Sequence, residues 1–317
     1  MTTKLPKPRL SRWGHSVYEL PEKVAAEEEL FSEWVEVTEQ YSDAEIVVVH
    51  SKQVVGESEL ALMPSVKMVI TTTSGFEHLD WRLMHTRGII PVRMPLLRRD
   101  AVVESILAML LHANRRQWRF LQDAQHNAWT RHRLTEYEPI RIQDQRIAVV
   151  GLGVIGIRLC QVLNSLGATL YGVDPQGVPH ELPFVTRTEF QDLPRQVDAT
   201  LLACTHNASS HQMINAEWLE QCQAMTLINC ARGKLVDVEA ALNAAENQHL
   251  AFLGLDVFPI EPYTSLSNAV RYPNVVCTPH AAGYHPALGT QIQSGLINIV
   301  SSWIKRDTIP FVVEERC

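Results

Sequence analysis

The sequence lacks the features that mark membrane, exported and nucleic-acid-binding proteins. No apolar run is long enough to span a bilayer, and the basic, proline-containing residues 1–12 are followed by no apolar signal-peptide segment. Positive charge is also in deficit, with a formal net charge of -7 and a pI near 6.0, so nothing attracts the chain generally to nucleic acid or anionic lipid. We therefore expect a cytoplasmic protein that acts on a small molecule, with neither a nucleic acid nor a membrane as partner.

The cysteines lack the CxxC spacing of zinc sites and redox motifs, and the chain shows no internal repeat or low-complexity tract. Most of them lie in or beside apolar runs, which is typical of reduced, buried thiols. We expect neither a disulfide framework nor a metal site. The six positions are Cys160, Cys204, Cys222, Cys230, Cys277 and Cys317.

The chain has ample length and apolar content for two domains: 317 residues, of which 46% are hydrophobic. Short β-like runs separated by helical or turn-like stretches indicate a βαβ arrangement before residue 100. One long helix is then expected over 100–121, with Asp100 as its N-cap and Glu104 favoured near its start by the helix dipole. The β-like runs are 45–50, 66–73 and 88–92.

A second β/α series follows the polar stretch 127–145. Six strand candidates alternating with helices predict a parallel, doubly wound sheet. The helical stretch 287–305 could return to the first half of the chain, so we expect a discontinuous domain of residues 1–110 and 288–317 around a dinucleotide-binding domain of residues 111–287. The strand candidates are 146–150, 169–173, 199–203, 226–229, 252–255 and 275–278.

A glycine-rich motif links the first two strands of this second series. The strand RIAVV runs into GLGVIG, which opens a helix predicted over 157–166. Gly151 permits the tight turn, Gly153 lets the backbone approach a pyrophosphate, and Gly156 allows close packing of helix on strand. The free N–H groups at the helix start, around Val154 and Ile155, would face the phosphates.

Asp174 completes the dinucleotide fingerprint. It ends the second strand, eighteen residues beyond Gly156, where a carboxylate can accept hydrogen bonds from an adenosine ribose. A carboxylate there repels a 2′-phosphate, and Pro175-Gln176-Gly177 supplies no Arg or Lys. These features favour NAD(H) over NADP(H).

The chemistry must come from the ends of later strands, where parallel sheets of this kind bind ligands. Three successive ends carry Arg232, Glu261 and His280. Reduction of a 2-keto acid needs a cation for the carboxylate, a proton donor for the carbonyl oxygen, and a group that keeps the donor protonated. Guanidinium, imidazole and carboxylate have these properties, respectively.

Each of the three residues also has a purely structural interpretation. Arg232 could cap or salt-bridge a loop, Glu261 could be an exposed turn residue, and His280 could be a buried, hydrogen-bonded histidine. Their occurrence at three successive strand ends behind a dinucleotide fingerprint favours the catalytic interpretation.

The segments NCARGKLVD, GLDVFPIEP and TPHAAG, in this order behind GLGVIG, resemble the motifs of the D-isomer-specific 2-hydroxyacid dehydrogenase family, and in particular its glyoxylate/hydroxypyruvate reductases. The resemblance covers nearly the whole chain. It implies two Rossmann-like doubly wound domains, a flavodoxin-like substrate domain and an NAD-binding domain, with a cleft between them. It also implies a homodimer built on the long helix from Asp100.

The resemblance further assigns roles to individual residues. Arg232 would bind substrate, and Glu261 would pair with His280 as the acid/base. The backbone of the loop Ser74, Gly75 and Phe76 would bind the substrate carboxylate. Residues implied along the cofactor are Thr205, Ser210, Cys230, Ala231, Asp256 and Gly283.

Some positions depart from the family pattern, which leaves the substrate open. They are Glu77, Arg93, Leu96 and Val154. The basic run that contains Arg93, Arg98 and Arg99 could recognise a second anionic group on a dicarboxylate or phosphorylated keto acid, or it could be a solvated surface run.

Two other functions are compatible with these motifs. The first is an NAD(H)-binding regulatory protein of the same fold, similar to the transcriptional corepressors related to this family. The second is oxidation of formate or phosphite, although we find no formate-specific N-terminal features. We do not expect a long, allosteric phosphoglycerate dehydrogenase, because no sequence for a C-terminal regulatory domain follows the last motif before Cys317.

Overall fold

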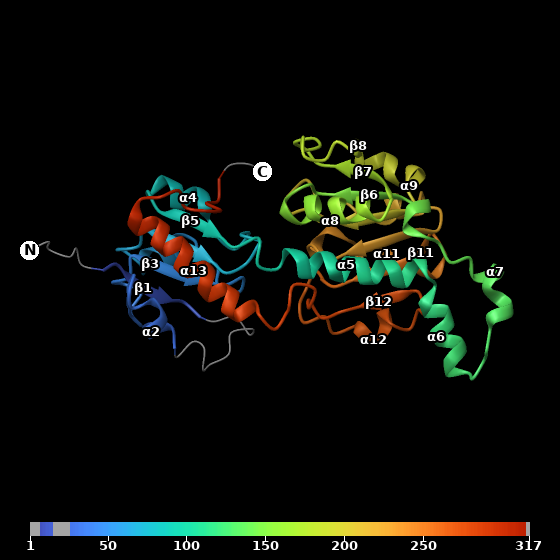
Figure 1. Cartoon of the computed structure of the whole chain (residues 1–317), viewed down its shortest axis with the longest axis horizontal. Coiled ribbons are helices and arrows are strands. Elements are labelled where there is room, and N and C mark those ends of the chain that lie inside the picture. The colour runs from blue at the N-terminus through green and yellow to red at the C-terminus, as the bar shows by residue number, and fades with distance from the viewer. Residues whose placement is uncertain (1–6, 15–25, 315–317) are drawn as a thin grey trace, which may run out of the picture. The chain divides into compact units, whose positions relative to one another are not determined.

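The computed structural model describes residues 7–14 and 26–314, which form two compact α/β units. Of these residues, those up to Arg98 and from Tyr284 onward form unit 1, and Arg99–Gly283 form unit 2 (Figure 1). The sequence placed the domain boundaries at 110/111 and 287/288. In the structure all of helix α5 (Arg99–Asn114) belongs to unit 2, because it packs on a helix and two strands of that unit.

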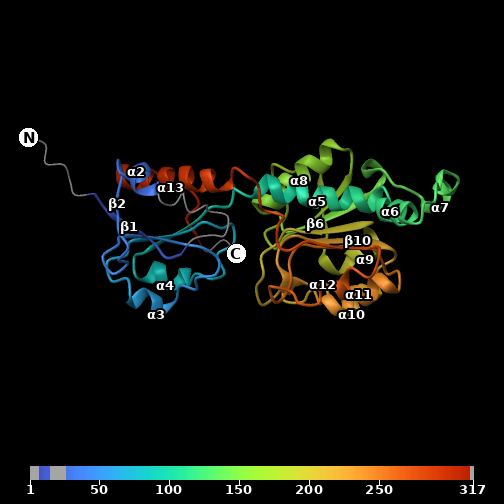
Figure 2. The ribbon, with the colours of Figure 1, turned by 90° about the horizontal axis from the view of Figure 1, so that it is seen from below.

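Unit 1 is built on a parallel five-stranded sheet with the order β2-β1-β3-β4-β5, a flavodoxin-like order. Two of the interior strands, β3 and β4, are buried along their whole length, as expected for a parallel sheet covered on both faces. Helices α2 and α13 cover one face, and α3 and α4 cover the other (Figure 2). The strands are β1 Arg9–Arg12, β2 Glu36–Val37, β3 Ile46–Val49, β4 Met68–Thr71 and β5 Ile90–Arg93, and the helices are α2 Glu27–Phe31, α3 Glu57–Ala61, α4 Trp81–Thr86 and α13 Leu288–Lys305.

Unit 2 is built on a parallel seven-stranded sheet with the order β12-β11-β10-β9-β6-β7-β8. Successive strands are added outward on one side of β6 and then on the other. The strand order therefore reverses at β6 and β9, where doubly wound sheets bind ligands. The strands are β6 Arg146–Val150, β7 Thr169–Val173, β8 Val185–Arg187, β9 Ala199–Leu202, β10 Met225–Asn229, β11 Leu250–Leu255 and β12 Val275–Cys277.

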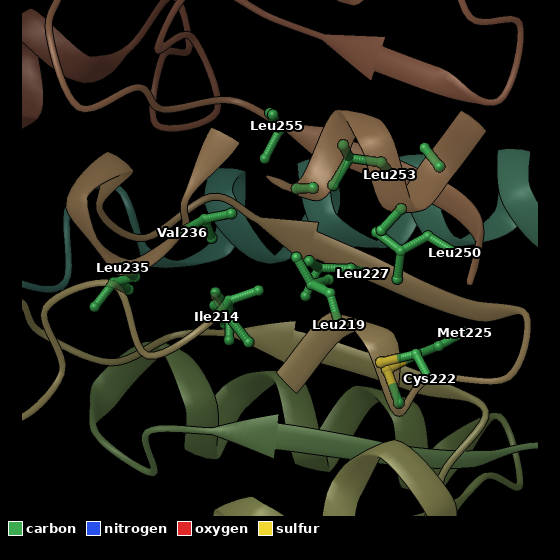
Figure 3. Close-up of a cluster of buried hydrophobic side chains, with 14 of the residues drawn as sticks. Ile214, Leu219, Cys222, Met225, Leu227, Leu235, Val236, Leu250, Leu253 and Leu255 are labelled. Carbon is green, nitrogen blue, oxygen red and sulfur yellow. The ribbon is translucent and has the colours of Figure 1, made fainter. Parts of the chain in front are cut away.

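Two apolar clusters fill the two faces of this sheet. Side chains of α5 and α8 form one cluster against it, and side chains around α10 and α11 form the other (Figure 3). The glycine at position 254 of β11 allows a close approach from α5, because a Cβ there would lie 2.8 Å from the sulfur of Met109. The helices are α6 Gln117–Gln125, α7 Leu134–Tyr137, α8 Val154–Ser165, α9 Leu193–Gln196, α10 Ala216–Glu220, α11 Val238–Glu246 and α12 Leu266–Ala269, with 3-10 turns at Arg131–Arg133, Ile142–Asp144, Phe190–Asp192 and Gly233–Leu235.

The expected single helix over 100–121 is wrong: the chain forms α5 and α6 with a break between them. Arg116 at the break has φ +52°, the left-handed conformation that ends helices. Its guanidinium donates hydrogen bonds to the carbonyls of Ala113 and Tyr137, at 3.4 and 3.2 Å. The apolar pattern continues through the break, so the change of backbone conformation leaves no trace in the periodicity.

Asp100 is not the N-cap that the sequence predicted. The helix begins one residue earlier, and the Asp100 carboxylate instead accepts hydrogen bonds from Arg99 at 2.8 Å and from Arg158 of α8 at 3.0 Å. Arg158 thereby links the start of α5 to α8 within unit 2.

The six predicted strands of the second series are present, and the sequence missed three short ones. These are β1, β2 and β8, at or near sheet edges, with four, two and three residues. Their sequences carry Arg, Ser, Glu or Thr among the apolar residues, which weakens the apolar run by which a buried strand is recognised. Within the described part of the chain, no helix has the length and apolar character needed to cross a membrane.

Candidate active site

The turn between β6 and α8 requires glycine at two positions. Gly151 has φ +93°, and a Cβ on it would lie 2.5 Å from the backbone of Cys204, after β9. A Cβ on Gly156 would lie 1.9 Å from the carbonyl oxygen of Gly151. These approaches bring the first turn of α8 against the ends of β6 and β9, at the reversal of the strand order.

Gly153 is different, because a Cβ there would meet nothing within 4 Å. It is the N-cap of α8, so the N–H groups of the first helical turn, including those of Val154 and Ile155, point out of the helix end without helical partners. Open space beside a residue without a side chain, together with outward N–H groups and a helix dipole, fits a pyrophosphate.

Asp174 lies at the end of β7, next to this turn. Its carboxylate accepts hydrogen bonds from the N–H groups of Leu152 at 2.8 Å and of Gln176 at 2.9 Å, one on each oxygen. A carboxylate offers about four acceptor positions, so capacity remains for ribose hydroxyls. The side chain is therefore both a brace for the glycine turn and a candidate ligand for the adenosine ribose.

The loop after β9 carries Thr205 and Ser210. The Ser210 hydroxyl lies in hydrogen-bond contact with the carbonyl of Thr205 at 3.1 Å and the N–H of Asn207 at 2.9 Å, and Ser210 is buried. Thr205 is exposed. Ser210 thus holds the shape of the loop, and Thr205 is the residue of the two that a ligand can reach.

Arg232 follows β10 in a loop shaped by Asn229. The Asn229 amide accepts from the N–H of Ala231 at 3.0 Å and donates to the carbonyl of Arg232 at 2.9 Å. Cys230 and Ala231 are buried. The next residue must be glycine, because a Cβ on Gly233 would lie 1.9 Å from the backbone of Phe258, after β11. This approach brings the loop of Arg232 against the loop of Glu261.

Asp256, at the end of β11, organises the turn that carries His280. Its carboxylate is buried and accepts from the hydroxyl of Thr278 at 2.6 Å and the N–H groups of Ala281 and Ala282 at 2.8 and 3.0 Å. The backbone of His280 has φ +55°, a conformation that costs about 1 kcal/mol or more for a residue with a Cβ. Its N–H donates to the carbonyl of Asp256 at 2.7 Å, so the turn is tied to β11 through both backbone and side chain.

Glu261 and His280, which the sequence predicted as an acid/base pair, lie within hydrogen-bond distance of each other. Oε2 of Glu261 lies 2.7 Å from Nδ1 of His280, and Oε1 accepts from the N–H of Phe258 at 3.0 Å. Because a carboxylate can only accept, Nδ1 carries a hydrogen. Nε2 is therefore the nitrogen that can give a proton to a ligand or take one from it.

The surroundings shift the pKa of both groups. The hydrogen bond to Glu261, followed by the negative charges of Glu261 and Asp256, raises the pKa of His280 against the opposing effects of burial and of Arg232. Burial acts to raise the pKa of Glu261, but its bonds to His280 and Phe258 and the positive charges of His280 and Arg232 outweigh burial, and that pKa is lowered. The guanidinium of Arg232 acts on both groups, so the three residues share one electrostatic environment.

Ser74, Gly75 and Phe76 lie in unit 1, between β4 and α4. No described residue accepts a hydrogen bond from the N–H groups of these three residues. Consecutive free N–H groups in a turn form an anion-binding concavity. The same unit carries Glu77 and Leu96, both exposed, and the guanidinium groups of Arg93 and Arg98, which donate to carbonyls of the segment 72–74.

Sequence reasoning missed three residues that shape unit 2's site. Asn229 sets the loop of Arg232, Gly233 allows its approach to Phe258, and Thr278 donates to Asp256. Each lies within one of the quoted motifs, yet its effect depends on which strands are neighbours. To find these three residues, one would have had to know that β10, β11 and β12 are neighbours in the sheet.

The sequence matches the family model described as "D-isomer specific 2-hydroxyacid dehydrogenase, NAD binding domain" over residues 107–282. The chain belongs to this family. The matched segment falls inside unit 2 and contains the glycine turn, Asp174, Arg232, Glu261 and His280. Unit 2 is accordingly the NAD-binding domain.

Curated relatives at 25–28% identity include three different dehydrogenases or reductases. D-lactate dehydrogenase of Escherichia coli is 27% identical over 77% of this chain and 78% of its own length. Glyoxylate/hydroxypyruvate reductase B of Klebsiella pneumoniae is 25% identical over 73% and 72%. D-3-phosphoglycerate dehydrogenase of Mycobacterium leprae is 28% identical over 75% of this chain, but the match spans only 45% of that relative.

Solved structures share the fold at lower identity. D-lactate dehydrogenase of Aquifex aeolicus, complexed with NAD and lactic acid, has a TM-score of 0.80 at 22% identity over 94% of this chain and 96% of its own. An acyclic imino acid reductase in complex with NADPH and D-Arg has a TM-score of 0.81 at 18% identity, over 96% and 100%. The predicted fold, two Rossmann-like parallel α/β domains, is confirmed.

Proposed function

We propose that this protein is an NAD(H)-dependent oxidoreductase that interconverts a small 2-keto acid and its D-2-hydroxy acid. The observation that carries the proposal is the Glu261–His280 pair, with Nδ1 and Oε2 2.7 Å apart, in the electrostatic range of Arg232. These groups follow three neighbouring strands of the sheet that carries the dinucleotide turn.

In this mechanism NADH, when bound, supplies the hydride that reduces the keto carbon. Arg232 binds the carboxylate and the carbonyl oxygen, because a guanidinium presents paired N–H donors to two oxygens. His280 donates its Nε2 proton to the carbonyl oxygen, and Glu261 stabilises the protonated imidazole. In the reverse direction, neutral His280 accepts the hydroxyl proton through the same nitrogen.

The N–H groups of Ser74, Gly75 and Phe76 complete carboxylate binding in this proposal. The residues that line the cofactor are the glycine turn with Asp174 and, on later strands, Thr205, Cys230, Ala231, Asp256 and Gly283. Ser210 contributes through the conformation of its loop.

We further propose a preference for NAD(H) over NADP(H). The carboxylate of Asp174 would repel a 2′-phosphate, although a cation is near: a Cβ on Gly177 would lie 3.8 Å from a guanidinium nitrogen of Arg187. The ratio of kcat/KM for NADH to that for NADPH should therefore exceed one in the native enzyme. Asp174→Asn should lower the ratio and Arg187→Ala should raise it; a native preference for NADPH would contradict the proposal.

A homodimer is proposed through the segment 117–137 of unit 2, which contains α6 and α7. Helix α6 buries none of its residues, and large apolar side chains are exposed on it and beyond it: Leu121 by 57%, Trp129 by 86% and Leu134 by 43%. The segment is nevertheless fixed, because Asp123 accepts from the hydroxyls of Thr130 and Tyr137 at 2.6 and 2.7 Å. A held apolar surface of this kind is typical of an interface.

The function is tested with purified protein, NADH and a panel of glyoxylate, hydroxypyruvate, pyruvate and oxaloacetate. Loss of NADH absorbance should accompany formation of the 2-hydroxy acid, and chiral chromatography of the pyruvate or hydroxypyruvate product should show the D isomer. Binding of NADH without turnover of any 2-keto acid would favour the NAD(H)-binding regulatory protein instead.

A further inference from the structure

Two arginines of unit 1 hold the backbone of the loop that would bind the substrate carboxylate. Arg93, the last residue of β5, donates from Nη1 to the carbonyl of Ser74 at 3.3 Å. Arg98 donates from Nη1 to the carbonyl of Thr72 at 2.5 Å. Arg93 also lies over the ring of Phe76, 5.3 Å from its centroid. Both side chains are only partly exposed.

The bond from Arg93 determines the direction of an N–H group. Peptide groups are planar and trans, so the carbonyl of Ser74 and the N–H of Gly75 point in opposite directions. A cation that holds this carbonyl on one side directs the Gly75 N–H to the other, where no described residue accepts it. The same cation polarises the peptide group, which strengthens the N–H as a donor.

A chain of hydroxyl groups holds the carbonyl of the next peptide group, between Gly75 and Phe76, in a similar way. Thr73 donates to the carbonyl of Gly75 at 2.7 Å, and its hydroxyl lies 2.8 Å from that of Thr71. Thr71 in turn lies 2.9 Å from Nε2 of His78. The carbonyl of Gly75 is thereby held, so the N–H of Phe76 points away from this chain. The directions of the two adjacent N–H groups, those of Gly75 and Phe76, are therefore fixed by Arg93 and Thr73, which bind the carbonyl on the other side of each peptide group.

We propose that Arg93 is a positioning residue for substrate binding: it orients and polarises the Gly75 N–H that donates a hydrogen bond to the substrate carboxylate, and Arg98 anchors the start of the same loop. This inference rests on the proposed function and adds a specificity consequence. The guanidinium of Arg93 acts on the loop and not on a second anionic group of the substrate. Removal of this guanidinium should therefore weaken the binding of monoanionic and dianionic keto acids equally.

The test compares Arg93→Met, Arg93→Lys and the matched control Arg87→Met. Arg87 is also an arginine of unit 1 with a hydrogen-bonded partner, the carboxylate of Glu57, but it lies outside the loop. Steady-state kinetics with NADH should show KM for pyruvate and oxaloacetate raised about tenfold or more in Arg93→Met. The KM for NADH should be unchanged and kcat should change less than KM. Arg93→Lys should restore part of the loss, because it retains a cationic donor.

Each outcome decides the matter. Equal KM values in Arg93→Met and Arg87→Met would overturn the inference, and a selective loss for oxaloacetate would assign Arg93 to a second anionic group instead. If Arg93→Met does not fold, Arg93→Lys carries the test, since an unchanged KM together with native folding would also contradict a geometric role. The wild-type enzyme separates the two claims: without turnover, and without NADH-dependent binding of oxamate by calorimetry, the proposed function itself fails and the inference fails with it.

Discussion

At the scale of single residues, the site depends on a few groups whose positions are set by neighbours. Glu261 fixes the tautomer of His280, and Asp256 holds the turn on which His280 lies. Sequence spacing identified the first pair, because the three motifs end successive strands. It could not identify the buried hydrogen bonds of Asp256, since these depend on the conformation of a turn.

The pKa shifts predict how activity and stability depend on pH. In the proposed mechanism reduction needs protonated His280, so kcat/KM for reduction should fall as pH rises through the raised pKa of His280. In Glu261→Gln this inflection should move to lower pH, because the hydrogen bond and charge that raise that pKa are lost. A pH profile of the wild type and variant checks this, and an unmoved inflection would show that another group is titrating.

The same pair contributes to folding within a defined pH window. The contribution of His280, whose pKa is raised on folding, is full below its ordinary value of 6.5 and is lost as pH rises through the folded value. The contribution of Glu261, whose pKa is lowered, is full above 4.5 and is lost as pH falls through the folded value. Both are present between pH 4.5 and 6.5. The difference in Tm between wild type and Glu261→Gln should be largest there.

At the scale of elements, the strands that position the site were largely predictable, and the helix boundaries were not. β6 and β7 begin and end where the sequence indicated, because a buried parallel strand is a continuous apolar run. The break at Arg116 could not be predicted, since an arginine carries no signal for a left-handed backbone. The short edge strand β8 was missed for lack of an apolar run.

Two glycines of one turn should separate folding from cofactor binding. Gly156→Ala places a Cβ 1.9 Å from the Gly151 carbonyl, so it should destabilise the protein by about 1–3 kcal/mol. In Gly153→Ala the added Cβ meets no protein atom within 4 Å. This substitution should leave Tm nearly unchanged while weakening NADH binding about tenfold. Thermal unfolding and NADH fluorescence titration measure both. A lower Tm in Gly153→Ala, with NADH affinity retained, would show that the pyrophosphate does not bind beside Gly153.

At the scale of the whole molecule, two parallel sheets with their own apolar clusters explain why the chain leaves unit 1 after Arg98 and returns to it at Tyr284. The sequence indicated a return through the last helix, because that helix has the apolar periodicity of a packed element. In the structure α13 covers the sheet of unit 1. The proposed homodimer rests on a different feature, the exposed apolar surface of α6 and its neighbours.

The proposed dimer predicts a pair of contrasting substitutions. Leu121 on α6 and Leu62 beside α3 are exposed to nearly the same extent, 57% and 58%. A charged residue at either position should therefore have an equally small effect on the folding of its own unit. Leu121→Glu should nevertheless yield a monomer, because it buries a charge in an apolar interface. Leu62→Glu should remain dimeric. Light scattering during gel filtration measures the mass, and a dimeric Leu121→Glu would place the interface elsewhere.

The central claim is that His280, paired with Glu261, transfers the proton in NADH-dependent reduction of a 2-keto acid. The most direct measurement is single-turnover loss of NADH absorbance in the wild type and in His280→Ala, with NADH binding measured separately by fluorescence. We predict that His280→Ala binds NADH with unchanged affinity and reduces the best substrate at least about 100-fold more slowly. Equal rates in the two proteins would contradict the account.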